Sequence, residues 1–351
     1  MRWMPLFVVL VACGDPKDKP DAGGVTPDTP VVVDMGIDAD PNNPMTLMDT
    51  GLCLDAACTQ IAPGIRPYSP QFQLWSDGAT KKRWIYLPPG TQIDTSNMDF
   101  WQFPVGTKLW KEFTRDGVRV ETRLVMRIAQ GSTNPDSDWF YVAFVWNQTQ
   151  DATTAEPFGV PDANGTQHDV PNRSQCKICH NNTQPSRVLG FSAIQLDHAA
   201  SSGEVALQTL IDENLLTNNP TSSSTAGGYF PLPGSSIEKA ALGYLHANCG
   251  HCHNPSSKVY TDNGVLMQLR ETVGTLGTLT STTVYQTAVN QNGTLPQGNI
   301  TKLVDPGLPD SSLMILRFES TNPALHMPLL GSEIMDPSGQ TILRDWVTSL
   351  Q

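Results

Sequence analysis

Two short segments of this chain repeat one pattern of cysteine and histidine. The first reads "RSQCKICHNN", from Arg173 to Asn182, and the second reads "NCGHCHNP", from Asn248 to Pro255. In each segment two cysteines stand three positions apart and a histidine follows directly after the second. The fold has to present two thiols and an imidazole at both places, so these segments constrain it more than any other feature.

Three kinds of site use paired cysteines. Zinc ribbons separate their two pairs by roughly 15–20 residues, whereas 73 positions separate Cys176 from Cys249. A thioredoxin-like dithiol needs a βαβ setting, which the surrounding sequence does not predict. Histidine makes up only 7 of the 351 residues, yet it follows both pairs, and Cys-x-x-Cys-His is the signature of covalent haem attachment. The pattern therefore predicts two covalently attached haem c groups, each with its iron.

The spacing has a physical reason. Residues three apart lie on one face of a helix, so both thiols can reach the two vinyl groups of one porphyrin. The next residue then presents its imidazole to the iron as proximal ligand. The residues predicted to hold haem 1 and haem 2 in turn are Cys176, Cys179 and His180, and Cys249, Cys252 and His253.

The chain opens with a segment that resembles a lipoprotein signal. "MRWMPLFVVLVAC" has a positive charge at Arg2, an apolar run from Met4 to Ala12, and Cys13 at its end. The run is too short to span a bilayer and is typical of a signal peptide, expected at residues 1–12. "LVAC" resembles a bacterial lipobox, in which Cys13 becomes the lipidated first residue. The alternative is an unmodified cysteine in a signal peptide that is cleaved elsewhere.

A tether is expected to follow over residues 13–50. This stretch is rich in Asp, Pro and Gly and has too few large apolar residues to order itself. The net charge of −12 argues against nucleic acid or an anionic lipid surface as partner, and the basic run 81–83 is expected in a solvated turn. No later segment is apolar for long enough to span a membrane. We therefore expect a protein of the cell envelope that is lipid-anchored, faces the periplasm and is placed at the outer membrane.

Residues 51–165 have the pattern of strands. In "VRVETRLVMRI", alternate residues share a face. The first face takes Val118, Val120, Thr122, Leu124 and Met126, and most of the other takes Arg119, Glu121, Arg123 and Arg127. Cys53 and Cys58 are expected to form a disulfide, as suits an oxidising compartment, and a metal-binding pair is the alternative.

Helix signals dominate after residue 234. Ser235 and Glu238 form a predicted capping box before the second motif, and Asp336 with Pro337 starts a last amphipathic helix. We predict a multidomain α+β protein. A β-rich, sandwich-like domain at 51–165 precedes a mainly α-helical region with two haems, divided into a first haem segment at 166–234 and a second domain at 235–351.

The part from Ser235 to the end resembles a class I c-type cytochrome. In that family the helix that carries Cys-x-x-Cys-His packs across the C-terminal helix, and a Met-Pro pair in the preceding loop supplies the distal ligand. "HMPLLGSEI" puts Met327 at this place, so the resemblance implies Met327 as distal ligand of haem 2. A core role for Met327 is the alternative, and Met314 and Met335 are the other candidates.

Haem 1 has no such methionine, because none stands between His180 and Cys249. We expect a nitrogen ligand or an open position. The candidates for the nitrogen ligand are His198, His246 and His168. His251 lies between two haem 2 cysteines and is poorly aimed at its own iron.

The chain as a whole resembles exported bacterial diheme c-type cytochromes with a β-rich N-terminal region. The resemblance covers about residues 60–351 and includes "PYSPQFQLWSDGATKKRWIYLPPG", "FWQFPVGTKLWKEF", "VPNRSQCKICH" and "YLHANCGHCHNP". It implies electron transfer with periplasmic or membrane redox proteins as partners. A diheme enzyme of the peroxidase type, with one open haem site, is the alternative, and the carrier is favoured because Met/His ligation closes haem 2.

Overall fold

The computed structural model describes residues 43–181, 188–221, 228–263 and 265–351. Residues 39–351 form one compact unit. Cys13, the signal peptide and most of the expected tether lie outside the described residues. Among the helices that are described, none is both long and apolar enough to cross a membrane. The domain boundaries after residues 165 and 234 stay predictions.

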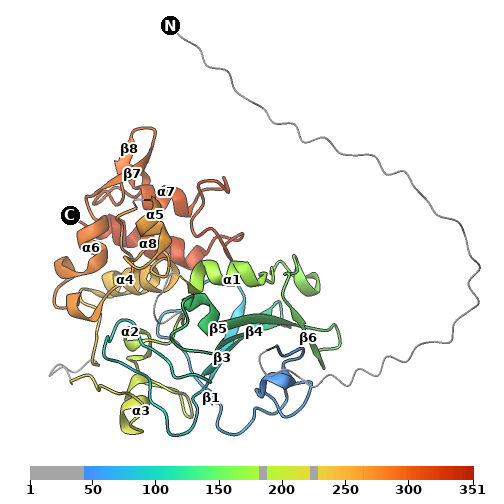
Figure 1. The fold of residues 1–351 in the computed structure, drawn as a ribbon. Coiled ribbons are helices and arrows are strands. Elements are labelled where there is room, and N and C mark those ends of the chain that lie inside the picture. The colour runs from blue at the N-terminus through green and yellow to red at the C-terminus, as the bar shows by residue number, and fades with distance from the viewer. Residues whose placement is uncertain (1–42, 182–187, 222–227, 264) are drawn as a thin grey trace, which may run out of the picture. The chain divides into compact units, whose positions relative to one another are not determined.

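A six-stranded antiparallel sheet forms the first half of this unit (Figure 1). Its strands pair in chain order: β1 (Arg66–Pro67), β2 (Thr80–Tyr86), β3 (Lys108–Arg115), β4 (Val118–Arg127), β5 (Trp139–Trp146) and β6 (Thr153–Glu156). Local sequence explains the tightest connection. Asp116 and Gly117, between β3 and β4, have φ angles of 51° and 82°, and such two-residue loops match the twist of the flanking strands.

Both faces of the sheet are covered. On one face Trp84, Trp110 and Phe144 pack against the segment around Leu52. On the other face Ile85, Leu109 and Tyr141 belong to a core that also contains residues of α2 (Ala193–Leu196) and α3 (Leu207–Asp212). The α+β class is confirmed, but the sandwich is not: within the described residues this sheet has helices and loops over it, where a second sheet was expected. The later chain supplies the apolar side chains that a second sheet would have provided.

The basic run 81–83 was expected in a solvated turn, and this was wrong. The run belongs to β2, where alternation turns Lys82 outward with 73% of its side chain exposed. Arg83 is only 4% exposed. The reason is that strand pairing continues through the run, so every second side chain has to face inward.

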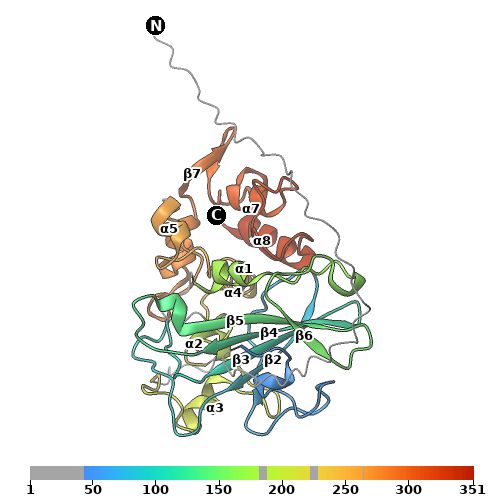
Figure 2. The ribbon, with the colours of Figure 1, turned by 45° about the vertical axis from the view of Figure 1, so that its right-hand side comes forward.

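Helices form most of the second half. They are α1 (Arg173–His180), α4 (Ser236–Asn248), α5 (Lys258–Asn263), α6 (Thr283–Ala288), α7 (Leu313–Phe318) and α8 (Pro337–Ser349), with a hairpin of β7 (Asn292–Gln297) and β8 (Ile300–Lys302). Short 3₁₀ turns lie at Met48–Thr50, Pro135–Asp138, Ala163–Gly165, Val273–Thr275, Leu279–Ser281 and Pro309–Ser311. Figure 2 shows α1 beside the sheet, on the side where α4, α7 and α8 lie.

Both predicted helix starts are confirmed. The Ser235 hydroxyl accepts from the Glu238 N–H at 3.4 Å, and the Glu238 carboxylate accepts from the Ser235 N–H at 2.5 Å. The Asp336 carboxylate accepts from the Ser338 N–H at 3.0 Å, with Pro337 in the first turn. α4 packs against α8, and their shared core includes Leu245 and Trp346.

Candidate functional site

The first motif lies on α1, as its spacing predicts. Asn172 caps this helix: its side chain accepts from the Gln175 N–H at 2.9 Å, and the Gln175 side chain accepts from the Asn172 N–H at 2.8 Å. Cys176 and Cys179 are therefore one turn apart on a helix, and His180 is its last residue. The imidazole of His180 packs against the Tyr141 ring of β5, with centroids 5.2 Å apart.

A cavity of about 770 Å³ opens beside this helix. The residues of α1, the sheet and the later chain that line it include Cys176, Cys179 and His180; Lys111, Arg123 and Tyr141; and Tyr244, His251, His326, Met335 and Asp336. Pockets that hold small molecules and cofactors usually measure about 300–1,000 Å³. Two thiols and an imidazole on one wall of such a cavity are the donor set that covalent haem attachment needs.

The second motif follows the end of α4. Cys249 is the C-terminal cap of this helix, and its N–H donates to the Leu245 carbonyl at 2.9 Å. The N–H of His253 donates to the Cys249 carbonyl, also at 2.9 Å. The N–H of Cys252 also donates to the Cys249 carbonyl, at 3.1 Å. The second motif therefore lies in a hydrogen-bonded turn after α4 has ended, and not on a helix as its spacing predicts. Cys249, Cys252 and His253 do not line the 770 Å³ cavity.

Burial controls the electrostatics of the second motif. It raises the pKa of the Cys249 thiol to about 12 and lowers the pKa of His253 to about 4. His253 is therefore neutral at physiological pH, which is the form that binds a metal. Its Nδ1 atom is buried and has no hydrogen-bond partner among the described residues. The other ring nitrogen interacts with the Met267 backbone, which partly offsets the effect of burial on this pKa. The neutral form is the property of His253 that fits a role as iron ligand.

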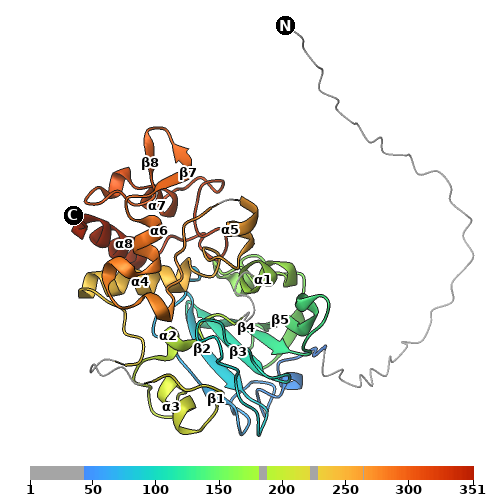
Figure 3. The ribbon, with the colours of Figure 1, turned by 60° about the vertical axis from the view of Figure 1, so that its left-hand side comes forward.

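The two motifs meet in space, which the sequence did not indicate. A hydrogen bond with the Cys252 thiol, together with burial, raises the pKa of the Cys179 thiol to about 12. His251 interacts with the same thiol and lines the cavity of the first motif. Cys179 lies near the end of α1, and Cys252 follows the end of α4. Figure 3 shows these two helices from a third side. His251 therefore belongs to the site of the first motif. The sequence did not indicate this, because the spacing within a motif shows only which residues are close along the chain.

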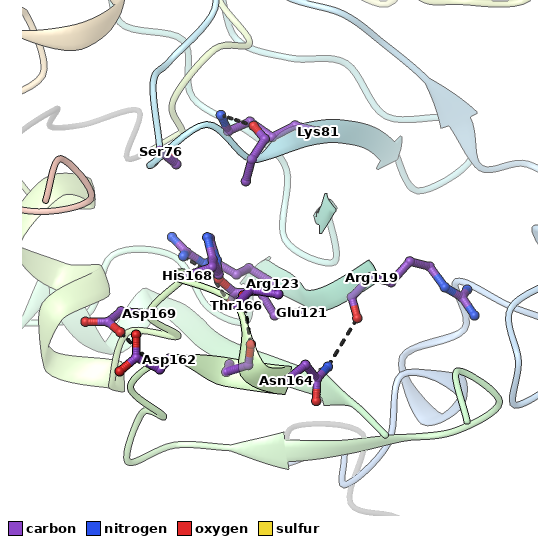
Figure 4. Close-up of polar contacts among 12 residues, drawn as sticks. Ser76, Lys81, Arg119, Glu121, Arg123, Asp162, Asn164, Thr166, His168 and Asp169 are labelled. Carbon is purple, nitrogen blue, oxygen red and sulfur yellow. Dashed lines mark hydrogen bonds and ion pairs between the residues drawn. The ribbon is translucent and has the colours of Figure 1, made fainter. Parts of the chain in front are cut away.

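The three histidines predicted as ligands of haem 1 lie in different surroundings. His168 lines the cavity, and its Nε2 lies 2.7 Å from Oε1 of Glu121 (Figure 4). The ring nitrogens of His198 lie 3.0 and 2.8 Å from backbone carbonyl oxygens of Ala199 and Ser69. Neither His198 nor His246 is among the residues that line the cavity.

His246 is held in a separate place. Its Nδ1 accepts from the Glu271 N–H at 3.2 Å, and the side chain lines a smaller cavity with His251 and Arg270. Burial lowers the pKa of His246 to about 3. Of the three predicted candidates, His168 is the one that the structure brings to the first motif.

Met327 is half-buried and its N–H donates to the Arg317 carbonyl at 3.1 Å. Its neighbours His326 and Pro328 line the 770 Å³ cavity, and so does Met335. Met314 is 8% exposed and belongs to the core around α7 and α8. The loop with the Met-Pro pair therefore borders the cavity, while Met327 itself is not among the lining residues.

Two further observations concern cysteine and metal sites. Cys53 and Cys58 are joined by a disulfide, with Cα atoms 4.9 Å apart. Within the described ranges, no three His, Cys, Asp or Glu side chains group as a cluster that could hold a bare metal ion.

Comparisons with models of known families, with curated proteins and with solved structures find no match to this chain. The function is therefore inferred from the residues and their geometry.

Proposed function

We propose that this protein is a diheme c-type cytochrome, tethered to a membrane of the cell envelope, that passes electrons between redox proteins of the periplasm or membrane. The observation that carries the proposal is the cavity beside α1, because both thiols and the imidazole of one motif line it. A second copy of the motif touches the first at Cys179 and Cys252. Bound haem would supply one-electron chemistry.

Each residue of the two motifs has a defined role in this proposal. Cys176 and Cys179 would form the thioethers of haem 1, and His180, packed on Tyr141, would be its proximal ligand. Cys249, Cys252 and His253 would do the same for haem 2. The finer fold assignment belongs here too: residues 235–351 are proposed as a class I cytochrome-like region, supported by α4 packing on α8.

Haem content tests the proposal directly. The protein, produced in a host with the haem c maturation machinery, should show two haems per chain by pyridine haemochrome assay. The variant Cys176→Ala/Cys179→Ala should retain one, and Cys53→Ala/Cys58→Ala is the control that removes two cysteines and should retain both. Zinc without haem absorbance in the wild-type protein would end the proposal.

Peroxide separates a carrier from a peroxidase-type enzyme. With a reduced donor and hydrogen peroxide, a carrier should turn over no faster than free haem, because Met/His ligation leaves haem 2 without a free position. Turnover well above that of free haem would assign the enzyme.

A further inference from the structure

Three cations stand side by side across the middle of the sheet. In the strand register, Arg83 of β2 lies opposite Lys111 of β3, and Lys111 lies opposite Arg123 of β4. Like charges directly opposite in neighbouring strands repel each other. Lys81, two residues before Arg83, lies on the same face, and the four residues Lys81, Arg83, Lys111 and Arg123 are here named the cation row.

Three members of the cation row lie close to one aromatic ring. Nζ of Lys81 and Nζ of Lys111 lie 5.8 and 5.9 Å from the centroid of Phe113, and Cζ of Arg123 lies 4.2 Å from it. Nζ of Lys81 also donates to the carbonyl oxygens of Leu74 and Ala79, at 2.8 and 2.9 Å. These contacts position the cations without supplying a negative charge.

Few carboxylates balance this charge. Glu121 accepts from Nε of Arg123 at 2.9 Å and also binds His168. Among the described residues, no carboxylate lies at ion-pair distance from Lys81, Arg83 or Lys111. Arg83 is buried and Lys81 and Lys111 are half-buried. Burial, together with the charges of Arg83 and Arg123, lowers the pKa of Lys81 to about 7 and that of Lys111 well below its usual range. An anion beside the row would offset this repulsion, so the row is suited to bind an anion from outside the chain.

The cation row borders the cavity of the first motif. Lys111 and Arg123 line it, together with Tyr141, which packs on His180. The acidic lining residues include Asp77, Asp169, Glu333 and Asp336, and Lys81 feels the charges of Asp77 and Asp336 at longer range. An anion in the cavity would therefore be attracted to the sheet and repelled by these acids.

We propose, on the basis of the proposed function, that the cation row binds the two propionate carboxylates of the haem held by Cys176 and Cys179. A porphyrin fixed by thioethers to α1 would carry both carboxylates in the same cavity as the row. The sheet would thereby supply the counter-charges of haem 1. A free carboxylate or another small anion would meet the same cations, so the test has to separate the two sources.

The test uses Lys111→Met in the full-length, haem-loaded protein, with Lys82→Met as matched control. Lys82 is the neighbour of Lys81 on the same strand but has an exposed side chain that points away from the row. Removing a cation beside the haem favours the ferric form, because oxidation adds a positive charge. Lys111→Met should shift the ferric-to-ferrous ratio of haem 1 about tenfold, which is about 59 mV for one electron.

Resonance Raman spectra give the second measurement. The propionate-bending band of haem 1 should move in Lys111→Met and stay in place in Lys82→Met, and Lys111→Arg should restore both the band and the potential. If Lys111→Met accumulates poorly, Lys81→Met removes a charge from the same ring and should shift both quantities in the same direction. Equal behaviour of Lys111→Met and Lys82→Met would overturn the proposal.

Two other outcomes would also overturn it, for different reasons. If added acetate shifts the wild-type potential, and Lys111→Met abolishes this response without moving the Raman band, the row binds a free anion. If the wild-type protein holds no haem, the proposed function has failed, and the haemochrome assay detects this before any potential is measured.

Discussion

The histidines differ in what their ring nitrogens already bind. His198 and His326 use both nitrogens: those of His326 lie 2.9 and 3.2 Å from the Ser320 carbonyl and the Ser332 hydroxyl. His168 and His251 line the cavity of the first motif, and the Nδ1 atoms of both are buried without a partner among the described residues. At the scale of single residues, these two rings are the best placed to act on the proposed haem 1.

Haem 1 is predicted to have a nitrogen ligand or an open position. With two imidazoles it should be low-spin with a potential below that of haem 2, and with an open position it should be high-spin and bind carbon monoxide when reduced. If His168 is the ligand, His168→Phe should convert a low-spin haem 1 to a high-spin one in the electron paramagnetic resonance spectrum. Two Met/His haems by magnetic circular dichroism would contradict the prediction and point to Met335.

In the proposed function, Met327 is the expected distal ligand of haem 2. Met327→His should lower the potential of haem 2 and abolish the near-infrared charge-transfer band of a methionine–iron bond, because a thioether favours reduced iron more than imidazole does. Met314→Leu, a change in the core, is the control and should keep both features. If the band survives Met327→His, another residue is the ligand.

At the scale of elements, two helices set the position of the second motif. α4 ends one residue before Cys249, and α8 packs along it through a close approach of Gly339 to the ring of Tyr244. A Cβ atom at Gly339 would overlap that ring. The contact also matters for the cavity, because Tyr244 lines it.

Gly339→Ala is therefore expected to destabilise the protein. Overpacking costs about 1–3 kcal/mol, which outweighs the roughly 1 kcal/mol that alanine gains over glycine inside a helix. Chemical denaturation should show the lower free energy of unfolding. Gly274→Ala is the matched control, since a Cβ there meets no atom within 4 Å, and it should leave stability unchanged or slightly raised. Equal stabilities of the two variants would mean that α4 and α8 can move apart without cost.

At the scale of the whole molecule, residues 39–351 fold as one compact unit, and the proposed lipid anchor at Cys13 lies outside the described residues. In the proposed function, the tether expected over residues 13–50 would give the carrier reach from the membrane. The net charge of −12 for the whole chain is unfavourable beside an anionic lipid surface.

The lipid anchor can be tested by cell fractionation. Cys13→Ala should release the protein from the membrane fraction into the soluble periplasm or stop its processing, while its haem content stays at two. The substitution removes the proposed acylation site and changes none of the residues that the structure describes. Unchanged membrane association would count against the lipobox.

The sequence by itself determined the features that depend on near neighbours. The helical setting of Cys176 and Cys179 follows from their spacing, and the starts of α4 and α8 follow from capping residues within four positions. Strand β4 follows from alternation, which holds for any strand whatever surrounds it. These properties are local, so a short window of sequence contains all the information they need.

Only the tertiary structure decided what lies against those elements. Alternation shows that Glu121 and Arg123 share a face of β4, but it does not show that the rest of the chain covers that face and leaves Glu121 with no exposure. Nor does it show that helices replace a second sheet, or that Cys179 meets Cys252. Such contacts join residues far apart in the chain, and their partners are chosen by packing and charge in the complete fold, which no local pattern records.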